Sequence, residues 1–193
     1  MEHLRNLDVF NVCFYIANLF WLLEFFVFRN RQKVGRFQET KSFWFLTISI
    51  LFVIVLTIYF SRMGWGLIKT NAIYPVFQIG ALTLYGLGLW LRYRGSHLLG
   101  RHFTRHVAVS SSINLVSHGP YRYLRHPLYL GLFLISVAFP LYVGNIYAFL
   151  VSLPLLWLLF SWRMRIEEKA LRLVHPTYAD WAKARYRFIP FIY

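Results

Sequence analysis

Apolar residues along this chain are gathered in long blocks, and polar residues are mostly confined to the segments between the blocks. The blocks cover residues 9–28, 43–60, 73–91 and 128–162. An α-helix of about 20 mostly apolar residues is long enough to cross the hydrocarbon core of a bilayer. The pattern therefore predicts membrane-spanning helices rather than the mixed surface of a soluble domain.

The last apolar block is too long for a single crossing. It is interrupted at Pro140 and again at the triplet Val143-Gly144-Asn145, which is typical of a tight turn. We expect two short helices that form a hairpin at this triplet. The predicted fold is an all-α integral membrane protein with a C-terminal helical tail and five transmembrane helices, at about 9–28, 43–60, 73–91, 128–143 and 146–162.

Lysine and arginine are unevenly distributed between the loops that this topology places on opposite sides of the membrane. Eighteen of the 21 lie in the segments 29–42 and 92–127 and in the tail from Arg163 onward, all on one side. Cytoplasmic segments next to membrane helices are enriched in these residues. We therefore expect the C-terminus and these loops in the cytoplasm, and the N-terminus outside.

Composition narrows the class of protein further. Of the 193 residues, 58% are hydrophobic, and the formal net charge is +14. Because the charges lie between apolar blocks, we expect anionic lipid headgroups rather than nucleic acid as their partner. Cys13 is the only cysteine, so we expect neither a disulfide nor a cysteine-based metal site. The first ten residues carry one arginine and two acidic residues before a long span, which does not fit a cleaved signal peptide.

A dense polar and aromatic motif, SHGPYRYLRHPLYLG (117–131), lies where the fourth helix is expected to begin. Pro127 is favoured in a first helical turn, whose free N–H groups and dipole attract anions. Arg122 and Arg125 add positive charge, and aromatic faces can hold a cation; the tyrosines are Tyr121, Tyr123 and Tyr129. A ligand with a carboxylate and a sulfonium, such as S-adenosylmethionine, fits this motif. The alternative is that arginine and tyrosine only anchor the helix at the membrane surface.

A second cluster, RMRIEEKAL, follows the fifth expected helix. If that helix continues, Arg163 and Glu167 are four residues apart and Arg165 and Glu168 are three apart, so both pairs can meet. The two glutamates point about 100° apart, so at most one is expected to face a pocket. A carboxylate can accept hydrogen bonds from ribose hydroxyls. The alternative is a solvated, salt-bridged helix.

These two clusters, in this order, resemble the isoprenylcysteine carboxyl methyltransferase family. That family belongs to a wider group of membrane methyltransferases that includes phospholipid N-methyltransferases. The resemblance rests on GPYRYLRHPLYLG, a helical hairpin, RMRIEEKAL and the terminal RFIPFIY, preceded by LGRHFT. It covers roughly residues 95–193.

The resemblance implies one membrane methyltransferase domain over residues 1–193, with pocket segments 95–131 and 163–193. It implies S-adenosyl-L-methionine as cofactor and a membrane-borne or apolar acceptor, such as a lipid or a prenylated molecule. The cofactor-binding residues that it implies are Tyr121, Arg125, His126, Pro127, Tyr129, Gly131, Glu167 and Glu168. It also implies that Arg163 positions an anionic substrate, with Arg165 as the competing choice.

One segment, VHPTYADW (174–181), departs from the family pattern. His175-Pro176 stands where the family commonly has Phe-Gly, and Trp181 stands where a second tyrosine is common, while Tyr178 remains. The acceptor therefore stays open between an isoprenylcysteine carboxylate, a phospholipid amine and a small thiol. Outside this group, the alternatives are an NADPH-dependent enzyme like the sterol reductases and a non-enzymatic membrane carrier.

Four smaller features are interpreted structurally. His102 and His106 have the spacing of a zinc pair but lack a third ligand, so we expect a solvated loop and no metal site. Glu24 is expected to reach the membrane surface, and Gln78 is expected to face either the helix bundle or the cofactor. The glycines of the third block are expected to allow close helix packing; these are Gly80, Gly86 and Gly88. The sequence leaves the oligomeric state open.

Overall fold

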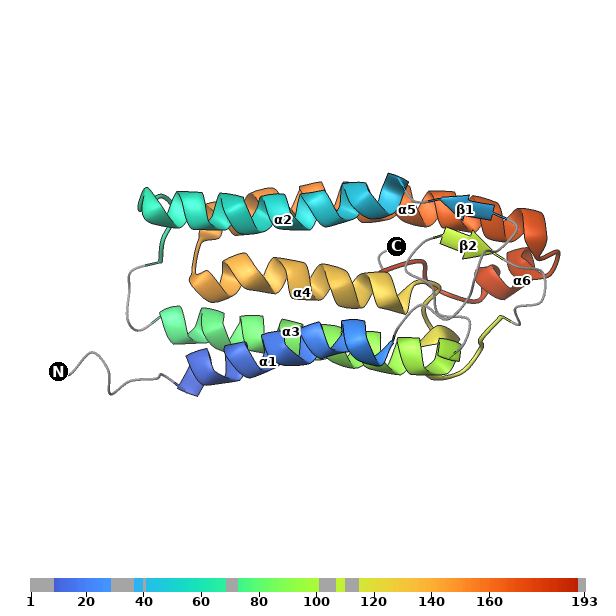
Figure 1. Cartoon of the computed structure of the whole chain (residues 1–193), viewed down its shortest axis with the longest axis horizontal. Coiled ribbons are helices and arrows are strands. Elements are labelled where there is room, and N and C mark those ends of the chain that lie inside the picture. The colour runs from blue at the N-terminus through green and yellow to red at the C-terminus, as the bar shows by residue number, and fades with distance from the viewer. Residues whose placement is uncertain are drawn as a thin grey trace.

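The computed structural model describes residues 9–28, 37–39, 41–68, 73–100, 107–109 and 115–190. The long helices lie side by side along one axis, as Figure 1 shows. They are α1 (Val9–Val27), α2 (Lys41–Arg62), α3 (Tyr74–Leu99), α4 (Pro127–Val143) and α5 (Ile146–Val174). The shorter elements are α6 (Tyr178–Lys183), the 3-10 helix η2 (Gly119–Arg122) and the strands β1 (Phe37–Glu39) and β2 (Val107–Val109).

All five expected helices are present close to their expected positions. The main differences are extensions: α3 continues to Leu99 and α5 to Val174. The all-α class is confirmed, with one small addition: β1 and β2 pair antiparallel, with Phe37 opposite Val109. Strands of three residues are too short to give a recognisable alternating pattern in the sequence.

Three of the described helices are long and apolar enough to cross a membrane by themselves. They are the helices at Trp44–Arg62, Tyr74–Leu99 and Ile146–Val174, whereas α1 and α4 are shorter apolar helices. The integral membrane class therefore has support from composition and helix length. The arrangement with five crossings stays a prediction.

The α4–α5 hairpin forms at the expected triplet, but α4 runs through Pro140 without ending there. Gly144 adopts a left-handed conformation, with φ of 73°, that ends α4. The Asn145 side chain caps α5 by accepting a hydrogen bond from the N–H of Ala148 at 3.0 Å. Its amide nitrogen also donates to the Trp65 carbonyl at 3.0 Å. This turn is therefore fixed to the end of α2.

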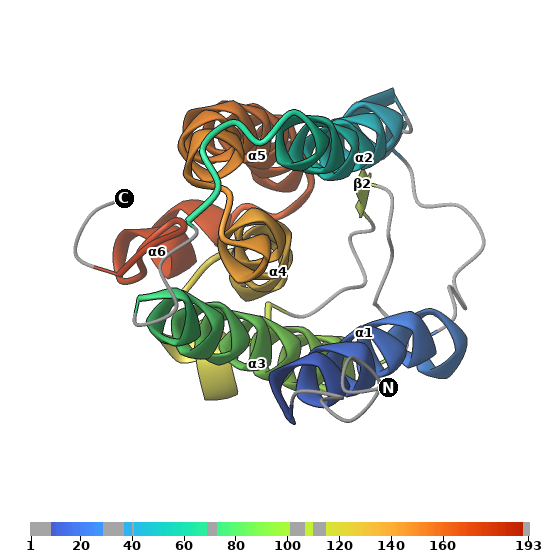
Figure 2. The same ribbon diagram turned by 90° about the vertical axis from the view of Figure 1, so that its left-hand side faces the viewer.

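Helix α4 lies between two helix pairs, α1–α3 and α2–α5, as the end view in Figure 2 shows. The approach to α3 is close because both helices have a glycine at the contact. A Cβ atom on Gly88 would lie 2.7 Å from the carbonyl oxygen of Gly131, and a Cβ on Gly131 would lie 2.7 Å from that of Gly88. The packing role expected for Gly88 is confirmed. It is wrong for Gly80 and Gly86, because a Cβ there meets nothing within 4 Å.

The C-terminal tail was expected to be helical, but it is only partly so, because α5 ends at Val174 and only α6 follows it. After α6 the chain turns back and lies along the segment that precedes α4. The N–H of Arg125 donates to the Tyr186 carbonyl at 2.8 Å, and the N–H of Tyr186 donates to the Tyr123 carbonyl at 2.9 Å. Phe188 is fully buried and packs edge-on against Phe133 of α4, with ring centroids 5.3 Å apart. The tail is thus part of the core.

Candidate functional site

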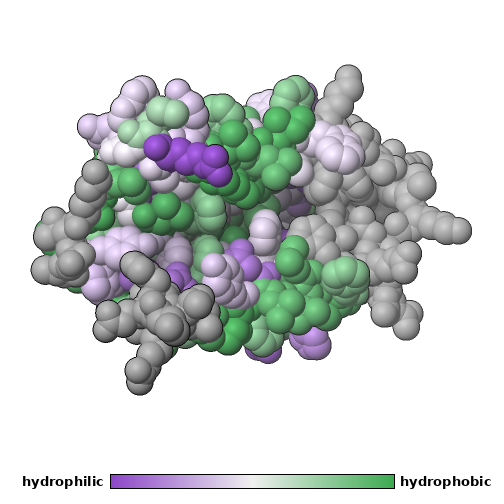
Figure 3. Space-filling model, turned by 60° about the vertical axis from the view of Figure 1, so that its left-hand side comes forward, coloured by the Kyte–Doolittle hydropathy of each residue, from purple (hydrophilic) through white to green (hydrophobic). Residues whose placement is uncertain are grey.

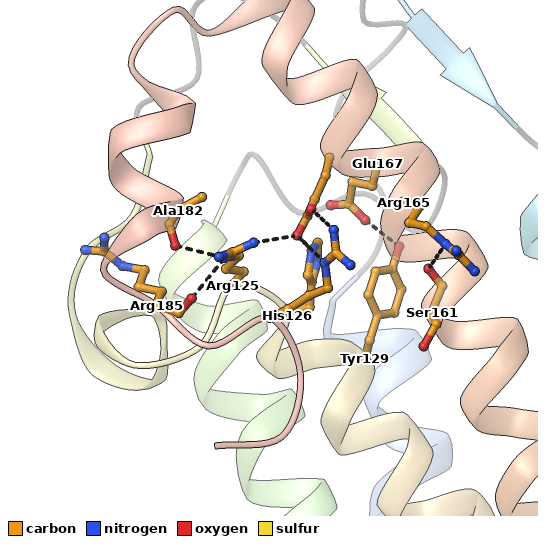
Figure 4. Close-up of polar contacts among 10 residues, drawn as sticks. Arg125, His126, Tyr129, Ser161, Arg165, Glu167, Ala182 and Arg185 are labelled. Atoms are coloured by element: carbon orange, nitrogen blue, oxygen red, sulfur yellow. Dashed lines mark hydrogen bonds and ion pairs between the residues drawn. The ribbon is translucent and has the colours of Figure 1, made fainter. Parts of the chain in front are cut away.

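Glu168 lies at the centre of a cluster of cationic side chains near the C-terminal end of α5. Arg187 donates from Nε to Oε1 at 3.0 Å and from Nη2 to Oε2 at 2.6 Å. His126 Nε2 lies 3.2 Å from Oε1, and Arg125 Nη1 lies 3.4 Å from the same oxygen. In Figure 4 a dashed line joins Arg125 to this carboxylate, whose residue is drawn without a label. The motif before α4, helix α5 and the tail therefore meet at one buried glutamate.

Glu168 lies six residues beyond Trp162, where the apolar part of α5 ends. Burial by itself raises the pKa of this carboxyl, but hydrogen bonds from His126 and Arg187 have the opposite and larger combined effect. The pKa of Glu168 is therefore held well below its usual range. The carboxylate stays ionised and holds its partners by charge-assisted hydrogen bonds.

Tyr129 joins the other predicted residues of α4 and α5. Its hydroxyl donates to Glu167 Oε2 at 2.6 Å and accepts a hydrogen bond from Arg163 Nε at 2.9 Å. The Arg163 guanidinium also lies over the Tyr129 ring, 5.4 Å from its centroid, which is a favourable cation–π distance. The three side chains form one hydrogen-bonded chain beside the Glu168 cluster.

The two candidate arginines differ sharply in environment. Arg163 is 2% exposed and faces Tyr129. Arg165 is exposed, and its Nε donates to the Ser161 carbonyl of its own helix at 3.3 Å (Figure 4). The contact between Arg165 and Glu168 that helical spacing allows is not among the described contacts of Glu168, which are with Arg125, His126 and Arg187. Of the two, only Arg163 belongs to the hydrogen-bonded chain with Tyr129 and Glu167.

The remaining residues of the motif 117–131 either lie within the fold around the site or are exposed. Tyr121 is buried in η2, where burial raises the pKa of its hydroxyl, and Pro127 is the first residue of α4. Gly131 lies against α3, where a Cβ would meet Arg92 Cγ at 2.7 Å. Arg122 and Tyr123 are exposed and contact each other, with the guanidinium 5.5 Å from the ring centroid. These last two do not join the cluster.

The sequence singled out Trp181 only as a departure from the family pattern, and it did not single out the arginines of the tail that complete the site. Arg185 Nε donates to the Tyr121 carbonyl at 2.8 Å, and Arg125 Nε donates to the carbonyls of Ala182 and Arg185 at 2.9 and 3.0 Å (Figure 4). Trp181 Nε1 donates to Ser117 Oγ at 3.0 Å. The terminal motif RFIPFIY indicated that the tail belongs to the pocket. No spacing in the sequence, however, indicates that Arg187 pairs with Glu168.

Several polar atoms near the site are buried without a hydrogen-bond partner among the described residues. They are Ser161 Oγ on α5, His175 Nε2 at its end and Tyr178 Oη on α6. Burial raises the pKa of Tyr178, so its hydroxyl stays protonated. Buried polar atoms are normally hydrogen-bonded, so these positions fit a polar ligand.

Two lesser expectations also have an outcome. Glu24 is buried and paired with Arg92 of α3 instead of reaching the surface. Gln78 is buried near the start of α3, far along that helix from Arg92. Within the described ranges, no group of three metal-ligating side chains is close enough to hold a metal ion. The histidines at 102 and 106 lie outside the described residues.

Sequence comparison identifies relatives for this chain. The isoprenylcysteine carboxyl methyltransferase (ICMT) family model matches residues 81–173. The protein-S-isoprenylcysteine O-methyltransferase of Schizosaccharomyces pombe is 35% identical over 103 residues, which are 52% of this chain and 44% of the relative. That of Saccharomyces cerevisiae is 34% identical over 87 residues, 44% of this chain and 36% of the relative. The chain thus spans less than half the length of these relatives.

Structure comparison agrees with this result at the level of the fold. The eukaryotic intramembrane Ras methyltransferase ICMT (isoprenylcysteine carboxyl methyltransferase) superposes with a TM-score of 0.61 and 24% sequence identity. The match covers 88% of this chain and 61% of that protein. The resemblance of this chain to the isoprenylcysteine carboxyl methyltransferase family is therefore confirmed, in sequence over residues 81–173 and in fold over most of its length.

Proposed function

We propose that this chain is an S-adenosylmethionine-dependent methyltransferase that methylates the carboxylate of an isoprenylcysteine-type acceptor at a membrane surface. The observation that carries the proposal is the Arg163–Tyr129–Glu167 chain, which lies beside the buried Glu168 cluster. The match to the ICMT family supports the same activity. We take residues 1–193 as one methyltransferase domain.

The residues around the cluster fit the polar groups of S-adenosylmethionine. The first turn of α4, which begins at Pro127, leaves backbone N–H groups for its carboxylate. The buried, unpartnered polar atoms of His175 and Tyr178 can bind further polar groups of the ligand. When bound, S-adenosylmethionine supplies a methyl group that is already activated by its sulfonium.

Of the two glutamates, we assign the ligand contact to Glu167. Both oxygens of Glu168 are engaged by Arg187, and one of them also by His126. Glu167 is half-buried and accepts from Tyr129 at Oε2, which leaves Oε1 for a ribose hydroxyl or an ammonium group. Glu168 then acts indirectly, by fixing the tail and the motif before α4.

Arg163 is the group that we assign to the acceptor. A buried guanidinium offers a planar set of donors to a carboxylate, and Tyr129 holds it in place. A carboxylate acceptor is already ionised, so it needs no general base, unlike an amine or a thiol. The remaining task of the protein is to orient the acceptor and exclude water.

We further propose that the chain crosses the membrane five times, with the N-terminus outside and the site on the cytoplasmic side. Large apolar side chains are exposed along the helices, as expected for contact with lipid tails, among them Leu19, Phe20, Phe52, Val55 and Leu158. Figure 3 shows such hydrophobic residues gathered over the helices on one face. The excess of lysine and arginine supports the orientation. An apolar acceptor would reach the site from the bilayer.

The test combines binding with turnover in detergent. Calorimetry is expected to show binding of S-adenosylhomocysteine but not of NADPH, and a labelled methyl group is expected to reach a farnesylated cysteine carboxylate. Failure of the folded protein to bind S-adenosylhomocysteine would contradict the cofactor. Transfer only to a phospholipid amine or a small thiol would contradict the acceptor and leave the methyltransferase class intact.

A further inference from the structure

A buried ion pair links α1 to α3 at the same end of the bundle as the site. Arg92 Nε and Nη2 donate to the two carboxylate oxygens of Glu24, each at 2.5 Å. Glu24 is 1% exposed and Arg92 is 8% exposed. Removing two charges from water is costly, and an apolar pair of similar volume often stabilises a fold as well or better. The pair therefore calls for a role beyond holding α1 on α3.

The contact made by the third guanidinium nitrogen of Arg92 indicates a role in positioning α4. Nη1 donates to the Leu128 carbonyl in the first turn of α4 at 3.3 Å. The side-chain stem packs at the same place, because a Cβ on Gly131 would lie 2.7 Å from Arg92 Cγ. The Arg92 side chain thus contacts α4 on both sides of Tyr129, through its guanidinium at Leu128 and through its stem at Gly131. An apolar residue at position 92 could fill the space but could not bond to the carbonyl.

We propose that Arg92 is a positioning residue for this site and that Glu24 serves as its buried counter-ion. Arg92 fixes the first turn of α4, and that turn carries Tyr129 and follows His126. Glu24 compensates the charge, which an apolar environment would otherwise exclude. Helix α1, which lies outside the sequence match to the family, thereby supports the geometry of the site. The expected effect of Arg92 on ligand binding rests on the proposed function. Its expected effect on the position of α4 does not.

Two single variants separate positioning from simple stabilisation. Arg92→Lys keeps a cation for Glu24, but one ammonium cannot reproduce three separate guanidinium contacts. Glu24→Gln keeps every donor of Arg92, including the one to Leu128. It removes the counter-charge and one of the two acceptor oxygens, because an amide nitrogen cannot accept from Arg92. The readouts are amide hydrogen exchange of residues 128–132, affinity for S-adenosylhomocysteine and unfolding temperature, all in detergent.

Arg92→Lys is expected to speed exchange of these amides and to weaken binding, each by about tenfold, the size expected for one lost hydrogen bond. Glu24→Gln is expected to lower the unfolding temperature more than Arg92→Lys does, and to change exchange and affinity less. If Glu24→Gln does not fold, the comparison of Arg92→Lys with the wild type decides whether Arg92 positions α4.

The proposal is overturned if Arg92→Lys exchanges like the wild type, or if Glu24→Gln disturbs residues 128–132 as much as Arg92→Lys does. A wild-type protein that does not bind S-adenosylhomocysteine would contradict the proposed function. In that case the exchange rates still decide whether Arg92 positions α4.

Discussion

The hydroxyl of Tyr129 is hydrogen-bonded to both Arg163 and Glu167, at 2.9 and 2.6 Å. It accepts from the arginine and donates to the glutamate, so one oxygen fixes the direction of both charged groups. Tyr129→Phe keeps the ring and removes this oxygen. We expect a loss of about 1–3 kcal/mol in the free energy of unfolding, because partners buried beside Tyr129 lose a hydrogen bond. We also expect methyl transfer to fall by about tenfold or more.

Tyr123→Phe is the matched control for this variant, because Tyr123 is 59% exposed and lies outside the cluster. Its unfolding and turnover are expected to remain close to those of the wild type. Equal losses in the two variants would contradict the assigned role of the Tyr129 hydroxyl.

Arg163 and Arg165 provide a second matched pair. Arg163→Lys removes a planar donor set from a buried position, so KM for an anionic acceptor is expected to rise by about tenfold or more. Arg165→Lys changes an exposed side chain that bonds only to the Ser161 carbonyl among its described contacts, and KM is expected to stay unchanged. Initial rates over a range of acceptor concentrations give both values. A larger effect at Arg165 would reverse the assignment.

Substitutions of the two adjacent glutamates are expected to affect different properties, stability for Glu168 and ligand affinity for Glu167. Glu168→Gln removes the anion from a buried cationic cluster, so the free energy of unfolding should fall by about 3 kcal/mol or more. Glu167→Gln should change stability less and weaken S-adenosylhomocysteine binding by about tenfold, the size of one charge-assisted hydrogen bond. Denaturation and calorimetry on both variants test this crossover. Loss of affinity without loss of stability in Glu168→Gln would favour the opposite roles.

The stability that Glu168 provides should depend on pH in the acid range. The pKa of Glu168 is lower in the folded than in the unfolded chain, where it lies near 4.5. Its contribution is therefore fully present above pH 4.5 and is lost as the pH falls toward the folded pKa. The difference in unfolding temperature between the wild type and Glu168→Gln should be constant from neutral pH to about pH 5 and then shrink. A difference that grows on acidification would contradict the ion-pair account.

The glycines of α3 give a packing prediction. Gly88→Ala places a Cβ 2.7 Å from the Gly131 carbonyl oxygen, so α3 and α4 must separate, and we expect a loss of about 1–3 kcal/mol. Gly86→Ala meets nothing within 4 Å and should be neutral or stabilise the helix by up to about 1 kcal/mol. Thermal unfolding of both variants distinguishes these outcomes, and equal effects would contradict the close contact.

The sequence by itself determined where the helices lie. Each of the five long helices contains an apolar block, or for α4 and α5 a part of the last block. Helix α4 begins at Pro127 and ends before Gly144 because proline and glycine have strong local preferences for these positions. The local motifs also indicated a candidate site between the start of α4 and the C-terminal part of α5. These features depend on residues that are neighbours along the chain.

Only the tertiary structure decided which charged groups meet. Glu24 and Arg92 are 68 residues apart, and Arg187 reaches Glu168 only because the tail turns back after α6. Helical spacing in the sequence is compatible with either Arg163 or Arg165 facing a pocket. In the folded chain it is Arg163 that packs against Tyr129. An ion pair between distant segments leaves no periodic signal in the sequence, because its partners are brought together by the packing of whole helices.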